Sequence, residues 1–125
     1  MSRLGVQNPI TAGQSIGSYN ASSVKDTDWH NLTSDEFYNV QTGTQITDGL
    51  KFAYVAIITN ASDLSYLKLR AAAGAGDSKS NTAGVIPVFG GFDIDAQALN
   101  TQVTAIAYAK AAGTDKTVIY AGFNL

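Results

Sequence analysis

The chain has 125 residues, no cysteine, one histidine and a formal net charge of −2. The absence of cysteine excludes disulfides, thiolate metal ligands and cysteine nucleophiles, and the single histidine excludes a metal site built from several histidines. The weak negative charge and the scattered lysines and arginines give no long-range attraction for a phosphate backbone, so we expect no nucleic-acid partner.

The length suits one domain with one core. Charged residues make up 14% of the chain, against about 25% in an average soluble domain. A surface with so little charge is less protected against association, which favours assembly. The longest apolar run, Phe52 to Ile58, is far shorter than the roughly 20 residues of a membrane helix, and the first residues lack the apolar run of a signal peptide. We therefore expect no membrane partner, and synthesis in a cytoplasm.

The first 25 residues mix glycine, proline, serine and asparagine with isolated valine and isoleucine, without a lasting strand or helix period. This pattern predicts an extended N-terminal arm over residues 1–25, which would become ordered against a neighbour in an assembly. A β domain is predicted over residues 26–125. Trp29, the only tryptophan, is expected to anchor the start of that domain.

Residues 51–59 form the strongest strand predicted before the last third of the chain, because β-branched and aromatic residues occur throughout and both faces are apolar. We expect this strand to lie centrally in a sheet, buried on both faces. Weaker strands are predicted around residues 36–40 and 45–46, between turn signals.

The next segment allows two interpretations. Residues 64–72 place Leu67 and Leu69 on one side and polar residues on the other, which predicts a half-exposed strand. The alternative is a helix over residues 62–73, capped by Ser62 and ended by Gly74. We prefer the strand, because a short turn after the preceding strand suits a hairpin. A long polar loop over residues 74–84 follows, and loops of that length often bind a partner.

Three β segments are predicted over residues 85–123. Pro87 cannot donate to a sheet ladder, so the first of these segments is expected at a sheet edge. Gly90 and Gly91 supply positive φ angles, either for a tight reversal or for a bulge at which the chain passes from one sheet to the other. No helix follows this glycine pair, so it does not match a phosphate-binding loop.

The second of these segments, residues 103–110, alternates a bulky face with a small alanine face. A helix over residues 96–112 is the alternative there. Residues 117–123 close the chain as a strand. About eight short strands with regularly spaced turns predict an all-β fold, a two-layer antiparallel β-sandwich of jelly-roll-like type.

The sole histidine, His30, would need a nucleophile such as Ser34 to act as a base. A packing role is favoured, because no catalytic motif surrounds it. We predict no catalytic, cofactor-binding or metal-binding residue in the chain.

Two pairs of carboxylates are spaced so that each pair would point to one side of a strand: Asp93 with Asp95, and Asp26 with Asp28. Calcium sites and glycosidases use paired acids, but the further ligands of a calcium loop are absent. A solvated strand face that discourages pairing with another sheet is the favoured role.

Aromatic side chains could form a sugar-binding platform, although core packing is the default interpretation for most of them. They are Phe52, Tyr54, Tyr66, Phe89, Phe92, Tyr108, Tyr120 and Phe123.

A set of short motifs follows in a definite order from residue 48 onward. They are Asp48-Gly49-Leu50-Lys51-Phe52-Ala53, then Ile58-Thr59-Asn60-Ala61-Ser62 with Tyr66-Leu67-Lys68-Leu69, the strand-Gly-Gly-strand unit Ile86 to Ile94, and Ala105-Ile106-Ala107-Tyr108-Ala109 with Thr117-Val118-Ile119-Tyr120. In this order they resemble small β-sandwich proteins of tailed-bacteriophage virions, of the head-decoration, capsid-cementing and adaptor type. The resemblance covers roughly 60% of the chain.

The resemblance implies a non-enzymatic structural protein of a bacteriophage particle, made in the host cytoplasm and located in the virion. Its implied partners are the major capsid protein or another virion protein, together with further copies of itself, a homotrimer being favoured. It brings no catalytic or ligand-binding residue. The alternative is a carbohydrate-binding or receptor-binding β-sandwich module that uses exposed aromatics.

Overall fold

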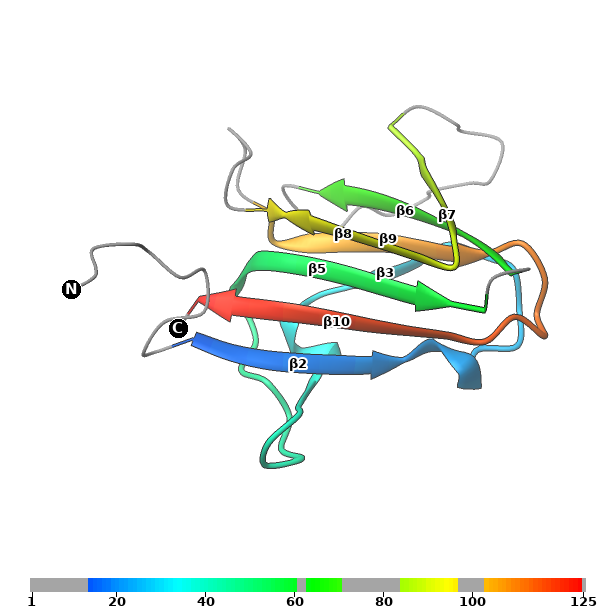
Figure 1. Cartoon of the computed structure of the whole chain (residues 1–125). Coiled ribbons are helices and arrows are strands. Elements are labelled where there is room, and N and C mark those ends of the chain that lie inside the picture. The colour runs from blue at the N-terminus through cyan, green and yellow to red at the C-terminus, as the bar shows by residue number, and fades with distance from the viewer. Residues whose placement is uncertain (1–13, 61–62, 71–83, 97–102, 125) are drawn as a thin grey trace.

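Two antiparallel sheets make up the part of the chain that the computed structural model describes, which is residues 14–60, 63–70, 84–96 and 103–124. The five-stranded sheet has the order β4 (Tyr38–Asn39), β2 (Gln14–Asn20), β10 (Thr117–Asn124), β5 (Lys51–Thr59) and β8 (Gly91–Asp95). The four-stranded sheet has the order β3 (His30–Leu32), β9 (Ala105–Lys110), β6 (Leu64–Arg70) and β7 (Ile86–Phe89). Figure 1 shows β2, β10 and β5 side by side in one layer and β6 with β9 in the other, so the predicted two-layer β-sandwich is confirmed.

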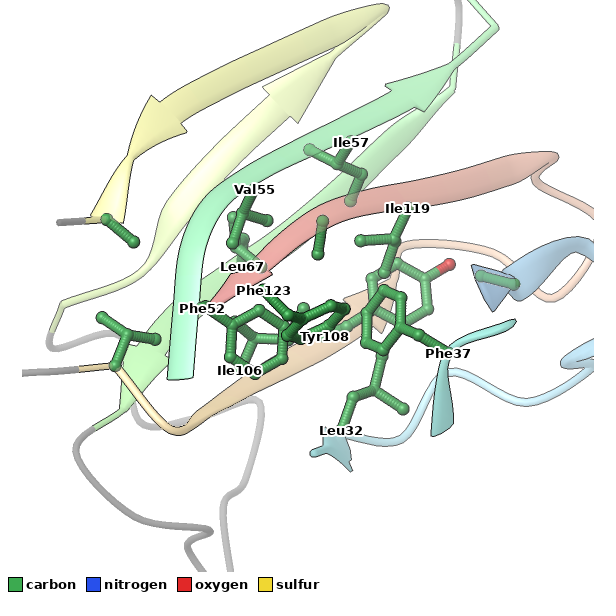
Figure 2. Packing of buried hydrophobic residues seen from close by; sticks show 14 of the residues in the cluster. Leu32, Phe37, Phe52, Val55, Ile57, Leu67, Ile106, Tyr108, Ile119 and Phe123 are labelled. Carbon is green, nitrogen blue, oxygen red and sulfur yellow. The ribbon is translucent and has the colours of Figure 1, made fainter. Parts of the chain in front are cut away.

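Aromatic rings from distant parts of the chain meet between the two sheets (Figure 2). The ring centroids of Phe37 and Phe123 lie 5.3 Å apart, and those of Phe52 and Phe123 lie 4.7 Å apart. Ile106 and Tyr108 enter the same core from the four-stranded sheet and are fully buried. Complete burial of one such side chain contributes about 1.5–3 kcal/mol. The inward residues of β5, β9 and β10 therefore hold the two layers together.

Both segments with a helical alternative contain strands. Leu64–Arg70 is β6, which pairs with β9 on one side and β7 on the other. Ala105–Lys110 is β9, which lies between β3 and β6. Cross-strand pairing on both sides outweighs the helical spacing of the leucines and alanines. The remainders of the two helical alternatives at 71–73 and 97–102 lie outside the described residues, as does most of the loop predicted at 74–84.

The glycine corner after Phe89 is confirmed as the place where the chain changes sheets. β7 pairs with β6 in the four-stranded sheet, whereas β8 pairs with β5 in the five-stranded sheet. Gly90 lies between them with a φ of 76°, which is costly for any residue with a Cβ atom. Pro87 is on β7, at the edge of its sheet as expected.

Part of the predicted arm belongs to the sheet instead. Gln14–Asn20 forms β2, which pairs with the central strand β10 and with β4. A 3-10 turn, Ala21–Ser23, follows, with Ala21 fully buried. On the inward side of β2, Gly17 lies directly beneath Phe37 and Phe123, and a glycine at this position interrupts the apolar strand period. Residues 1–13 lie outside the described part of the chain.

The prediction that β5 is buried on both faces is wrong for its outward side. β5 does lie inside its sheet, between β10 and β8. Val55 and Ile57 are fully buried, but Ile58 is 53% exposed. Its outward face is therefore apolar without being covered by the described residues.

No helix in the described ranges has the length and apolarity needed to cross a membrane.

Candidate interaction surface

The outward face of the five-stranded sheet gathers large apolar side chains from four strands and the residue after β4. We call it the tyrosine face and define it by Ile16, Ser18, Tyr38, Val40, Tyr54, Ala56, Ile58, Val118 and Tyr120. Five of these side chains, those of Ile16, Tyr38, Val40, Ile58 and Tyr120, are between 37% and 53% exposed. Single exposed apolar residues are ordinary, but a contiguous group on one sheet marks a contact surface.

Strand register places these residues in rows that run across the sheet. One row is formed by Tyr38, Ser18, Tyr120, Ala56 and Asp93, each the partner of the next. In the neighbouring row Ile16 pairs with Gly122, and Gly122 pairs with Tyr54. Residues in adjacent rows are diagonal neighbours within reach of aromatic side chains. The tyrosines and isoleucines therefore form one continuous surface.

The charged groups of this sheet lie at its rim. Asp93 and Asp95 project outward from the edge strand β8, so the prediction that they point the same way is confirmed. The Tyr54 hydroxyl donates a hydrogen bond to Asp93 Oδ2 at 3.1 Å. Partial burial, and then this hydrogen bond, raise the pKa of Tyr54 above its ordinary value. The tyrosine is thereby kept as a neutral donor, and the middle of the face carries no formal charge.

Sequence reasoning found only part of this surface. Tyr54 and Tyr120 were among the candidate sugar-binding aromatics, but Tyr38 was not, because it belongs to a strand of two residues. Of the other candidates, Phe52, Tyr108 and Phe123 are core residues, and Phe92 packs against the core. Phe89 is 64% exposed, but it lies on β7 in the other sheet.

His30 and Ser34 each contact other groups of the chain. The His30 ring contacts Asp26 Oδ1 at 2.7 Å through Nε2, and the same carboxylate oxygen accepts a hydrogen bond from the Asp28 backbone at 3.0 Å. The bond to His30, followed by the one to Asp28, lowers the pKa of Asp26. Ser34 is buried: its hydroxyl donates to the Thr47 carbonyl at 2.6 Å and accepts from the Leu50 amide at 3.1 Å. This hydroxyl braces the loop before β5.

The alanine face of β9 is outward and is covered by large side chains of the same chain. Ala107 and Ala109 are fully buried, and their partners on β6 are Lys68 and Tyr66. The Lys68 ammonium lies 4.9 Å from the centroid of the Trp29 ring, and the Trp29 and Tyr66 rings are 6.5 Å apart. The small residues of β9 thus leave room for this group of aromatic and cationic side chains. The outward face of the four-stranded sheet is therefore covered at β9 by side chains of the same chain, whereas the tyrosine face exposes its apolar side chains.

One end of the interior is polar. Lys110 is fully buried and donates through Nζ to the Val24 carbonyl at 2.5 Å. Beside it the Ser65 and Thr117 hydroxyls, one from each sheet, lie 3.3 Å apart. Desolvation lowers the pKa of Lys110, and burial raises the pKa of Tyr108 to about 12 against the opposing effect of the nearby hydroxyls. These groups are enclosed, so they act on stability rather than on an external ligand.

Within the described residues, no group of three or more histidine, aspartate or glutamate side chains is arranged to hold a metal ion. No protein-family model, curated protein or solved structure matches this chain. The function of the chain is therefore inferred from its own surfaces and motifs.

Proposed function

We propose that this chain is a non-enzymatic structural protein of a bacteriophage particle, which decorates or cements the capsid as a symmetric oligomer. The order of motifs from residue 48 onward supports the virion assignment by resemblance. The observation that carries the proposal is the tyrosine face, on which five apolar side chains are each more than a third exposed. Such a surface on a rigid sheet suits lasting protein–protein contact.

The properties of the face fit a partner of low charge. Its middle is neutral, and tyrosine combines a large apolar ring with a hydroxyl that can satisfy a polar group of the partner. The sheet beneath it is held by the buried aromatic cluster, so little order has to be gained on binding. The proposed partners are the major capsid protein or another virion protein, together with further copies of the chain.

A non-enzymatic role is also supported by how the reactive groups are used. The Ser34 hydroxyl is engaged by two backbone groups, and the His30 ring contacts a carboxylate that also caps the backbone. A hydroxyl that is buried and bonded on both sides is not positioned to attack a substrate.

The virion assignment can be tested by the position of the gene and by the content of the particle. We expect the gene to lie among capsid and portal genes, and mass spectrometry of purified particles to detect the chain. If the gene lies in a metabolic operon and the chain is missing from particles, the assignment is wrong. The face itself is tested by comparing the particle binding of two variants. Ile58→Asp changes the face, and the control Thr42→Asp changes an exposed loop residue.

A carbohydrate-binding or receptor-binding module is the second candidate. The observation that favours it is the presence of Tyr38, Tyr54 and Tyr120 on one face, two of them in the same row. A glycan array would detect such binding, and Tyr38→Ala and Tyr120→Ala should each abolish it. Binding of the protein to particles with no response on the array would exclude this candidate.

A further inference from the structure

The tyrosine face is nearly symmetric about its central strand. β10 is the third of five strands, so β4 and β8 lie two strands away on opposite sides of it. The rim at β4 presents Tyr38, whose hydroxyl can donate a hydrogen bond. The rim at β8 presents Asp93, whose carboxylate can accept more than one. Both residues belong to the same row, with Tyr120 between them on β10.

We propose that two copies of this chain pair face to face through the tyrosine face, about a two-fold axis that runs along β10. Such an axis places β4 of each copy over β8 of the other, and Tyr38 therefore faces the partner copy's Asp93 within the shared row. Tyr120 meets its own counterpart near the axis. The partner copy's Tyr54 faces Ile16, so an apolar pair stands beside the polar one.

The distribution of charge selects this axis over the other in-plane choice. A two-fold axis across the strands would place β8 over β8 and bring Asp93 against its own copy. Like charges opposed in a desolvated contact are destabilising, so that arrangement is rejected. Along β10, the carboxylates meet a tyrosine rim instead. The face is complementary to itself in one orientation only, which is the requirement for an isologous contact.

The face also has the size of a modest dimer contact. Strands spaced about 4.8 Å apart and rising about 3.3 Å per residue give this sheet a footprint roughly 20 Å wide and, along β2, roughly 23 Å long, with a shorter length at the edge strands β4 and β8. Projecting side chains make the accessible area larger than the footprint, so two such faces approach the lower end of the range for specific interfaces, about 1,200–2,000 Å² in total. Two sheets stacked in this way lie about 10 Å apart with their strands offset by about 30°. We expect a dissociation constant in the micromolar range.

This inference deepens the proposed function, because it names the surface through which copies of the chain contact one another in the symmetric oligomer. It rests only on the part of that proposal that concerns the oligomer. It differs from the three-fold assembly that the resemblance implies. It can be tested on the isolated chain, so its failure would leave the virion assignment untouched. If the virion assignment fails, the pairing of two copies can still be tested by measuring the mass of the isolated protein in solution.

The first experiment measures mass by analytical ultracentrifugation from sub-micromolar to hundreds of micromolar protein. We expect a reversible monomer–dimer equilibrium that Tyr120→Glu shifts at least tenfold toward monomer. Phe89→Glu is the matched control, because it places the same charge at an exposed aromatic of the other sheet and should leave the equilibrium unchanged. Circular dichroism must show that both variants keep the fold.

The second experiment tests the axis and uses the absence of native cysteine. Tyr38→Cys and Asp93→Cys proteins, prepared separately and then mixed, should be joined to each other by a short bis-maleimide, whereas each protein alone should cross-link poorly. Efficient self-linking of Asp93→Cys would indicate the rejected axis and overturn the proposal. A monomer at all concentrations, a trimer, or a mass unaffected by Tyr120→Glu would overturn it as well, and would assign the face to a different partner.

Discussion

Thr59 and Gly90 are joined by two hydrogen bonds at the corner where the chain passes between the sheets. The Thr59 hydroxyl oxygen accepts from the Gly90 amide at 2.8 Å, and the Thr59 amide donates to the Gly90 carbonyl at 2.9 Å. Thr59 is buried at the end of β5, and its hydroxyl also lies within hydrogen-bonding distance of the Asn60 carbonyl. One side chain therefore ties the end of β5 to the corner between β7 and β8.

Replacing Thr59 with valine should destabilise this corner. Valine keeps the shape of threonine but leaves the Gly90 amide without its acceptor, and an unsatisfied group of this kind costs about 1–3 kcal/mol. Urea denaturation would measure the loss as a lower midpoint with an unchanged slope. Thr59→Ser is the control, because it keeps the hydroxyl and should retain most of the stability. A loss in Thr59→Ser with none in Thr59→Val would show that the methyl group, and not the hydrogen bond, is what matters.

Gly17→Ala should be destabilising because β2 has no room for a side chain at that position. A Cβ atom there would lie 2.9 Å from Phe37 Cβ and 3.2 Å from Phe123 Cε2. Overpacking of a core costs about 1–3 kcal/mol. The control is Ser18→Ala, the next residue, whose side chain points outward. A thermal midpoint that falls for Gly17→Ala and not for Ser18→Ala is the expected result, and equal midpoints would contradict the packing described here.

Gly113→Ala should disturb the loop between β9 and β10. A Cβ atom at Gly113 would overlap the Lys25 carbonyl oxygen, so the backbone itself would have to move. The neighbouring Val24 carbonyl accepts the hydrogen bond of Lys110, and a shift of this segment would therefore also weaken the bond of the buried ammonium. We expect a loss above about 1 kcal/mol in urea denaturation. Thr114→Ala, an exposed change in the same loop, should have little effect.

Tyr108 should make the fold less stable in strong alkali. Its folded pKa is raised to about 12 from the ordinary tyrosine value of 10.0. The unfolded chain therefore loses this proton first, and the stabilisation, fully present below pH 10, is lost as the pH rises toward 12. Lys110 acts in the opposite sense: its lowered folded pKa makes stability rise with pH until its unfolded value, near 10.5, is passed.

The two effects are separated by comparing the wild type with Tyr108→Phe, which lacks the titrating hydroxyl and keeps Lys110. Between pH 8 and pH 12 the urea midpoint of the wild type should fall relative to that of Tyr108→Phe, because the wild type alone loses the Tyr108 contribution. A constant difference between the two proteins across this range would show that the Tyr108 pKa is the same in the folded and unfolded states.

Most of the strands could be predicted from sequence, but the exposed face could not. Residues 51–59 show apolar residues on both sides, a pattern that predicts burial on both sides. When apolar and polar residues do not alternate along a strand, both faces of the strand are apolar. The pattern does not say whether the outward face is covered by the same chain or by another molecule. β2 was missed for the converse reason, because a strand that passes close beneath Phe37 has a glycine where a large residue would mark its inner face. The corner at Gly90 was predictable, since glycine and proline leave local signals that do not depend on distant packing.

The order of the strands sets the timing of assembly during synthesis. β10 occupies the middle of the five-stranded sheet, yet it follows every other described strand in the chain, and β2, its neighbour, precedes them all. Until β10 leaves the ribosome, β4 with β2 on one side and β5 with β8 on the other have no strand to join them. Pairings of such high sequence separation form slowly. A nascent chain that stops short of residue 117 would thus expose two unpaired strand edges, which makes truncated products prone to aggregation.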